Sequence, residues 1–308
     1  MDIIDDIFST LDLKGALYFR TDFTPPWGTT VPEYKNAARF HLVIQGQCYV
    51  RVNNGPSQKI EAGDLILIPR GASHILSDQP VDNAPPLESV LEDAGYTGDG
   101  VLTVGSSSKN TSTQLVCGHF TFRTGAAHPI IQAIPEQLKT SNADRAKHPL
   151  LDDVLRLISQ RIYADELGTT AFIKRLSEIV FIELIRSGIG NDPAMETILK
   201  AFTDPKISHS LNLIHAKLSE PWTVEGLATE VAMSRSRFSN RFSELMGIGP
   251  MTYLADWRLQ KALALLESSR LSVQQIAIQI GYQSASAFTR AFSSKFGNSP
   301  TDFRRNLI

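Results

Sequence analysis

The sequence predicts a multidomain α+β protein with a β-rich amino-terminal part, a helical middle and an all-α carboxyl-terminal third. Two observations support this. The first 135 residues contain short apolar runs separated by Gly- and Pro-containing turns, which is typical of strands. The last third repeats one helical unit. We therefore expect domains at residues 10–135, 136–204 and 205–308.

The repeat is visible without any alignment to other proteins. Residues 223–228 match residues 272–277 in kind and spacing, and Phe238 then matches Phe288 after one extra residue, Gln283. A match sustained along the whole unit, with its insertion in a turn, indicates a duplicated supersecondary structure.

Each copy is expected to form a helix, a short turn and a second helix. Hydroxyl residues precede both helices as N-caps, and Phe238 and Phe242, or Phe288 and Phe292, bury one face of the second helix. The second helix of such a unit can enter a DNA major groove. The outward residues that we expect to contact DNA are Arg235, Ser236, Arg237, Ser239, Asn240, Gln283, Ser284, Ser286, Thr289 and Arg290. The alternative is a plain helical bundle, but its surface would carry Glu–Lys pairs rather than Ser, Asn, Gln and Arg.

Residues 281–292, GYQSASAFTRAF, and residues 296–304, FGNSPTDFR, resemble the signature of AraC/XylS-type transcription regulators. The resemblance implies two helix-turn-helix subdomains joined by one long helix at residues 250–268. It also implies binding to double-stranded DNA and a contact with RNA polymerase. The family usually has Arg where this chain has Asn240, whereas Arg290 matches. Because Asn can read adenine and Arg favours guanine, the difference predicts altered specificity.

The charge distribution agrees with DNA binding. Residues 206–308 contain 12 Lys and Arg against 7 Asp and Glu, whereas residues 1–205 contain 18 against 25. The net charge of −2 for the whole chain therefore conceals a basic carboxyl-terminal module on an acidic body.

In the amino-terminal part, residues 40–52 read as two strands broken at Gln45 and Gly46. Residues 63–74, GDLILIPRGASH, resemble the second cupin motif, which implies a small antiparallel β jelly-roll barrel. Residues 81–112 are rich in Asp, Gly, Pro, Ser and Asn, and are expected to form a long mobile loop.

The barrel also offers a candidate metal or effector site at His41, His74, Cys117 and His119. Cys117 and His119 are two apart, so a regular strand points both to one face. Imidazole and thiolate suit Zn²⁺ or another divalent metal. The histidine and glutamate motif of cupin enzymes is absent, however. These residues can equally be packed core groups, and Cys48 or Cys117 can also be read as a redox-sensing thiol.

Two helices are expected between the barrel and the repeat, at residues 150–164 and 169–187. The second is apolar on more than one face, so it either packs on the barrel alone or, as the resemblance implies, also forms a homodimer interface. A linker is expected at Asp204 and Pro205.

Two functions fit the sequence. The favoured one is a DNA-binding transcription regulator whose cupin domain senses a small molecule, a metal or an oxidant. The alternative is a metal-dependent cupin enzyme with a DNA-binding appendage, which the missing cupin metal triad disfavours. The acidic first residues, the two cysteines and the lack of a long apolar run predict a cytoplasmic protein.

Overall fold

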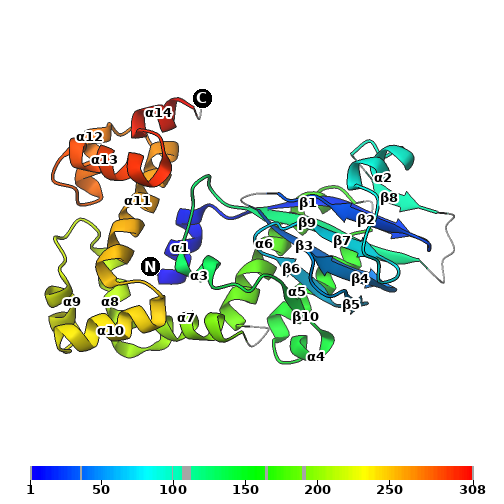
Figure 1. Cartoon of the computed structure of the whole chain (residues 1–308), viewed down its shortest axis with the longest axis horizontal. Coiled ribbons are helices and arrows are strands. Elements are labelled where there is room, and N and C mark those ends of the chain that lie inside the picture. The colour runs from blue at the N-terminus through cyan, green and yellow to red at the C-terminus, as the bar shows by residue number, and fades with distance from the viewer. Residues whose placement is uncertain are drawn as a thin grey trace. The chain divides into compact units, whose positions relative to one another are not determined.

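The computed structural model describes residues 2–34, 37–98, 100–105, 112–163, 166–188 and 192–306 (Figure 1). The chain forms two compact units. The sheet unit contains Leu13–Phe122 and Ile134–Asp192. The helical unit contains Met1–Asp12, Arg123–Ala133 and Pro193–Ile308.

The sheet unit has two β-sheets. The six-stranded sheet has the order β10-β6-β3-β9-β1-β8, and the four-stranded sheet has the order β2-β7-β4-β5. The strands are β1 (Lys14–Phe23), β2 (Gly28–Val31), β3 (Ala37–Gln45), β4 (Gln47–Val52), β5 (Gln58–Glu61), β6 (Leu65–Ile68), β7 (His74–Ser77), β8 (Val101–Val104), β9 (Thr113–Thr121) and β10 (Leu138–Thr140). Neighbours pair antiparallel, except that β8 pairs parallel with β1.

The six-stranded sheet is covered on two sides. Its inner face shares a core with the four-stranded sheet, including Val43, Val50 and Ile66. Its outer face packs on α6 (Thr169–Ser187), where the Phe120 and Phe181 rings lie 4.9 Å apart. Because both faces are covered, most residues of β3 are buried instead of alternating with exposed ones.

Three helices complete the sheet unit: α2 (Leu87–Asp93), α4 (Asn142–Arg145) and α5 (Pro149–Arg161). The two middle helices predicted at residues 150–164 and 169–187 are confirmed as α5 and α6, with residue 164 outside the described residues. Both helices pack within the sheet unit. The predicted linker region at residues 136–204 is therefore split, with residues up to Asp192 in the sheet unit and those from Pro193 in the helical unit.

The predicted loop at residues 81–112 is wrong in two places, because α2 and β8 lie inside it. Their packing partners explain this. Leu102 of β8 is 1% exposed in the core, and Leu87 and Leu91 of α2 pack against the same core. The local sequence is polar, but tertiary contacts stabilise both elements. Residues 99 and 106–111 lie outside the described residues.

The helical unit contains the duplicated unit almost as predicted. Its helices are α1 (Ile3–Leu11), α3 (Pro129–Gln132), α7 (Pro193–Thr203), α8 (Pro205–Ala216), α9 (Val224–Glu230), α10 (Arg235–Met246), α11 (Pro250–Ser268), α12 (Val273–Gln279), α13 (Ala285–Phe296) and α14 (Pro300–Arg305). The first copy is α9 and α10, the second is α12 and α13, and α11 joins them (Figure 1). Among the described residues, no helix combines the length and apolarity that crossing a membrane requires.

The two turns of the repeat have the same left-handed backbone but different residues. Ala232 has a φ of 51°, and Gly281, its match in the second copy, has a φ of 86°. A Cβ at Gly281 would lie 2.6 Å from an Arg258 nitrogen and 2.9 Å from the Ser219 Cα. Arg258 cannot easily retreat, because its guanidinium donates to the carbonyls of Leu218 and Glu220.

Two segments from the amino-terminal part of the sequence belong to the helical unit. Arg123 donates from its main chain to the Leu11 carbonyl and forms an ion pair with Glu267 of α11. Gln260, also on α11, accepts from the Ala127 N–H and donates to the Gly125 carbonyl. Residues 123–133 therefore pack with the repeat, although they fall inside the predicted barrel domain at 10–135.

A buried hydrogen-bond chain links these segments to α8 and α11. The His128 Nδ1 accepts from the Ile130 N–H, so its Nε2 carries the proton and donates to the Tyr253 hydroxyl, 3.0 Å away. Tyr253 then donates to the His215 Nε2 at 2.7 Å, and the His215 Nδ1 donates to Asp6 at 2.8 Å. Lys261 forms an ion pair with the same carboxylate. Because the His128 Nδ1 and the His215 Nε2 each accept a hydrogen bond, both histidines are neutral in this chain.

We expect the substitution Gly281→Ala to lower the free energy of unfolding by about 2 kcal/mol, because it combines a left-handed backbone with a close contact. Gly247→Ala is the matched control, since Gly247 has a φ of 73° with open space around it. This substitution should lower the free energy of unfolding only through the strained backbone conformation. Ala232→Gly should be neutral or stabilise by up to about 1 kcal/mol. Denaturant unfolding followed by tryptophan fluorescence measures all three, and an equal loss for both glycines would contradict the contact.

The helical unit should lose stability in mild acid. Burial, reinforced by His215, lowers the pKa of His128 to about 3, and burial also lowers the pKa of His215. The unfolded chain binds these protons near pH 6.5 and the folded chain does not, so the stability is complete above that pH and decreases below it.

The expected slope from His128 is up to about 1.4 kcal/mol per pH unit between pH 6.5 and pH 4, and His215 adds to it in the same direction. His128→Asn keeps a side chain able to cap α3, and should reduce the slope by one proton while costing about 1 kcal/mol at pH 7 for the lost Tyr253 bond. His209→Asn, at an exposed position on α8, is the control. An unchanged slope in His128→Asn would disprove the proton assignment.

Candidate nucleic-acid interface and interior histidine–cysteine cluster

The outward face of α10 is determined by what the helix buries. Phe238 and Phe242 are fully buried, while the Ser234 hydroxyl caps the helix by accepting from the Arg237 N–H. The predicted contact residues on this helix are Arg235, Ser236, Arg237 and Asn240, which are exposed, and Ser239, which is half-buried.

Helix α13 repeats this arrangement. Phe288 and Phe292 are fully buried, and the predicted contact residues are Gln283, Ser286 and Arg290, which are exposed, with Ser284 and Thr289 half-buried. The Ser284 hydroxyl accepts from the Ala287 N–H at 3.2 Å and lies 3.1 Å from the Ser286 hydroxyl. Ser284 therefore holds the start of the helix, and Ser286 is the more accessible of the two hydroxyls.

The arginines on these faces differ in whether they form ion pairs within the chain. Arg241 donates to Asp204 at 3.0 Å and to Glu244 at 3.1 Å. Within the described part of the chain, Arg235, Arg237 and Arg290 form no side-chain ion pair. These three side chains are therefore available for phosphate oxygens or base edges, whereas Arg241 is already paired.

One basic residue near this surface, Lys206, was not predicted from the sequence. A groove of about 730 Å³ beside α10 is lined by Lys206 of α8 together with Ser236, Arg237 and Asn240. Lys206 lies far from α10 in sequence, and its only local signal is its place in the first turn of a helix capped by Asp204.

Three of the four predicted sensor residues meet inside the sheet unit. His41 of β3 lies opposite Cys117 of β9, and its Nδ1 is 3.0 Å from the Cys117 sulfur. Its Nε2 is 2.8 Å from the Nε2 of His74, which comes from the other sheet. His119 lies opposite Arg39 instead, and its ring contacts Tyr34 edge-on. The geometry therefore joins His41, His74 and Cys117 as an interior cluster, with His119 beside it.

The hydrogen bond between His74 and the backbone determines where the protons of the interior cluster lie. The His74 Nδ1 donates to the Ala72 carbonyl at 2.9 Å, so its Nε2 accepts from His41. The His41 Nδ1 is then free to accept from the Cys117 thiol. Burial lowers the pKa of His41 well below its usual value and that of His74 to about 4, and burial raises the pKa of Cys117. All three groups are accordingly neutral.

This arrangement bears on the metal and redox interpretations. The Cys117 sulfur and the His74 nitrogen lie on opposite nitrogens of His41, so the three do not face one point as metal ligands would. Of the residues that the structure describes, no three His, Cys, Asp or Glu are grouped to hold a metal ion. Burial also raises the pKa of Cys48 to about 12, whereas a redox-sensing thiol needs a lowered pKa. A metal at this cluster stays a prediction.

Known proteins support the two-part organisation. Residues 2–190 match the family described as Cupin, and residues 227–306 match the family described as Helix-turn-helix domain. The chain is 30% identical over 312 residues to the HTH-type transcriptional regulator AlkR of Acinetobacter baylyi, covering 99% of each chain. It is 24% identical to the HTH-type transcriptional regulator MtrA of Neisseria gonorrhoeae, covering 99% of this chain and 98% of MtrA.

Among solved structures, an AraC-type transcriptional regulator from Chromobacterium violaceum is 27% identical, with a TM-score of 0.33, and covers 35% of this chain and 96% of its own. The full-length relatives are transcriptional regulators, which favours regulation over the enzyme alternative. The chain therefore belongs to the AraC-type family of DNA-binding transcription regulators, with a cupin domain preceding its helix-turn-helix domain.

Proposed function

We propose that this regulator reads double-stranded DNA with α10 and α13 together, and that its cupin domain senses a signal which controls this binding. One observation carries the DNA part: each helix exposes Ser and Arg side chains opposite a buried phenylalanine stripe, and α10 also exposes Asn240. In addition, α11 has 19 residues and is therefore about 28 Å long, close to the ~34 Å that separates successive major-groove segments. A contact with RNA polymerase stays a prediction, as does a cytoplasmic location.

We expect Arg290→Ala to weaken specific DNA binding by about 1–3 kcal/mol and to relax the preference at one or two base pairs. Asn240→Ala should act in the same way about one helical turn away. Arg270→Ala is the control, because Arg270 is exposed in the same unit but lies outside both outward faces. Footprinting and binding titrations on the DNA upstream of the gene, against a scrambled duplex, provide the measurement. Full discrimination in both variants would refute the assigned faces.

For the sheet unit, we propose that the two sheets form a jelly-roll barrel. The antiparallel pairing of all neighbours but β1 and β8 supports this, as does the single core that the sheets share. The signal sensed by this barrel belongs to the three classes inferred from the sequence: a small molecule, a metal or an oxidant.

We also propose a homodimer through α5 and α6. Most of the apolar residues of α6 are buried within the chain, including Ile185, which is 1% exposed. Phe172 and Ile179 of α6 remain 46% and 41% exposed, and Leu150 and Leu157 of α5 are also exposed. Each pair is seven residues apart, so each occupies one helix face. Four large apolar side chains on two neighbouring helices are typical of a protein interface.

Replacing Phe172 and Ile179 together by Glu should give a folded monomer, because both charges fall on the exposed face. Ile185→Glu is the contrasting variant, and should unfold the sheet unit by burying a charge. Light scattering gives the mass, and circular dichroism reports folding. If the double variant has the mass of the wild type, the dimer interface lies elsewhere or does not exist.

A further inference from the structure

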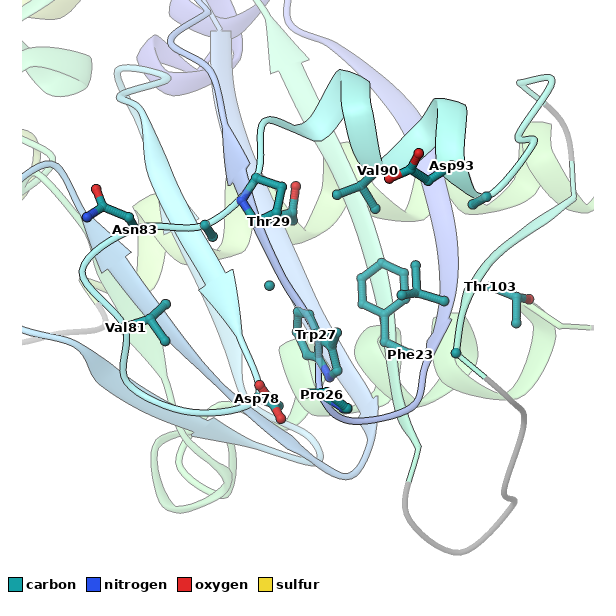
Figure 2. A pocket seen from close by; sticks show the side chains of 16 residues that line it. Phe23, Pro26, Trp27, Thr29, Asp78, Val81, Asn83, Val90, Asp93 and Thr103 are labelled. Atoms are coloured by element: carbon teal, nitrogen blue, oxygen red, sulfur yellow. The ribbon is translucent and has the colours of Figure 1, made fainter.

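A cavity of about 620 Å³ opens at one edge of the sheet unit (Figure 2). It lies where β1 ends and β2 begins, and one wall is the segment that follows β7 and continues into α2. Figure 2 shows Phe23 and Trp27 on the strand side and Val90 on the α2 side. The volume is in the range of small-molecule sites, which are typically about 300–1,000 Å³.

The floor of the cavity is aromatic. The Phe23 and Trp27 rings lie 4.8 Å apart, tilted by 53°, and both residues are more than nine-tenths buried. Pro26, Val81, Val90 and Val104 extend the apolar lining. Such a surface favours a flat or extended apolar molecule that can pack against the rings.

Two buried polar groups belong to residues that line the cavity. Among the residues that the structure describes, neither the Trp27 indole nitrogen nor the Thr29 hydroxyl has a hydrogen-bond partner. Trp27 is 7% exposed and Thr29 is 3% exposed. A buried polar group without a partner is destabilising, and the indole N–H can only donate. Both atoms are shielded from solvent, so a ligand that supplies an acceptor would bond them only if its binding shifts these side chains.

The charge of the lining selects among ligands. Its ionisable residues are Asp78 and Asp93, and the lining residues within the described part of the chain contain no Lys, Arg or His. Two carboxylates in a partly apolar cavity repel an anion and attract or tolerate a cation. The cavity therefore disfavours carboxylate or phosphate ligands.

We infer that this cavity is the effector site of the cupin domain, and that it takes an aromatic or otherwise apolar molecule which carries a hydrogen-bond acceptor and no negative charge. This rests on the proposed function, since it identifies where the sensor receives its signal. The site lies next to the interior cluster: Phe23 and Thr29 also border a void of about 20 Å³ lined by Arg39, His41 and Cys117. If a ligand displaces Phe23 or Thr29, the movement also changes the packing around this interior void.

Three probes with one skeleton test the chemistry: 4-phenylbutan-1-ol, 4-phenylbutylamine and 4-phenylbutanoate. Calorimetric titration of the full-length protein should show binding of the alcohol and the amine. The carboxylate should bind at least about tenfold more weakly, because its charge faces two aspartates. Equal binding of all three, tightest binding of the carboxylate or no binding of any probe would overturn the inference.

Variants locate the site. Val90→Trp should obstruct the α2 side of the cavity and weaken binding of the alcohol at least about tenfold, and Thr29→Val should weaken it about fivefold by removing one hydrogen-bond group. Asp93→Lys should shift the preference towards the carboxylate. Glu92→Lys is its matched control, since Glu92 is the exposed neighbour of Asp93 on α2 and lies outside the lining. Unchanged binding in Val90→Trp, or the same shift in Glu92→Lys, would place the ligand elsewhere.

DNA binding separates this inference from the proposed function. Without probe, Val90→Trp should occupy the upstream DNA as the wild type does, and only the wild type should change its occupancy when the alcohol is added. If the wild type binds DNA but no probe, the cavity assignment fails and the DNA-binding function stands. If Arg290→Ala and Asn240→Ala leave discrimination intact while the probes bind, the DNA faces fail and the cavity stands. Probe binding that never alters DNA occupancy would show that the cavity is not the effector site.

Discussion

The proposed DNA-reading surface depends on the burial of one aromatic stripe on each of two helices. Phe238 and Phe242 in the first copy, and Phe288 and Phe292 in the second, are fully buried. Their burial determines the rotation of each helix about its axis, so the opposite face must point to solvent. A helix rotated by one residue would turn its polar face by about 100°. The packing of the core therefore sets which side chains can meet a base.

Both units bury hydrogen-bond chains in which the histidines are neutral. In the helical unit, Asp6 ends the chain and carries the charge, which Lys261 balances. In the sheet unit, the chain runs from Cys117 through His41 to His74 and ends on a backbone carbonyl. A neutral histidine carries one N–H and one acceptor nitrogen. The hydrogen bond at one nitrogen therefore determines whether the other nitrogen donates or accepts, and this sets the tautomer along the chain. This explains why burial is tolerated, and why acid should disrupt both chains.

Local signals predicted the repeat well and the amino-terminal part less well. Ser234 and Ser284 cap their helices, and the glycines Gly247 and Gly297 end them in a left-handed conformation, as local sequence rules require. By contrast, β8 forms because β1 offers it a parallel partner, which no local pattern shows. The placement of α1 in the helical unit was likewise unpredictable, because the partners of its Asp6, His215 and Lys261, are more than 200 residues away.

The sequence by itself determined the class of protein, the paired helix-turn-helix units and the residues on their outward faces, because caps, periodicity and duplication all act over a few residues. It also predicted that His41, His74 and Cys117 would converge, from the strands that carry them. Only the tertiary structure decided that these three form a neutral hydrogen-bond chain, since the strand register sets which nitrogen meets which atom. Only the tertiary structure, too, assembled the cavity at Trp27, because its walls come from segments that meet through folding alone.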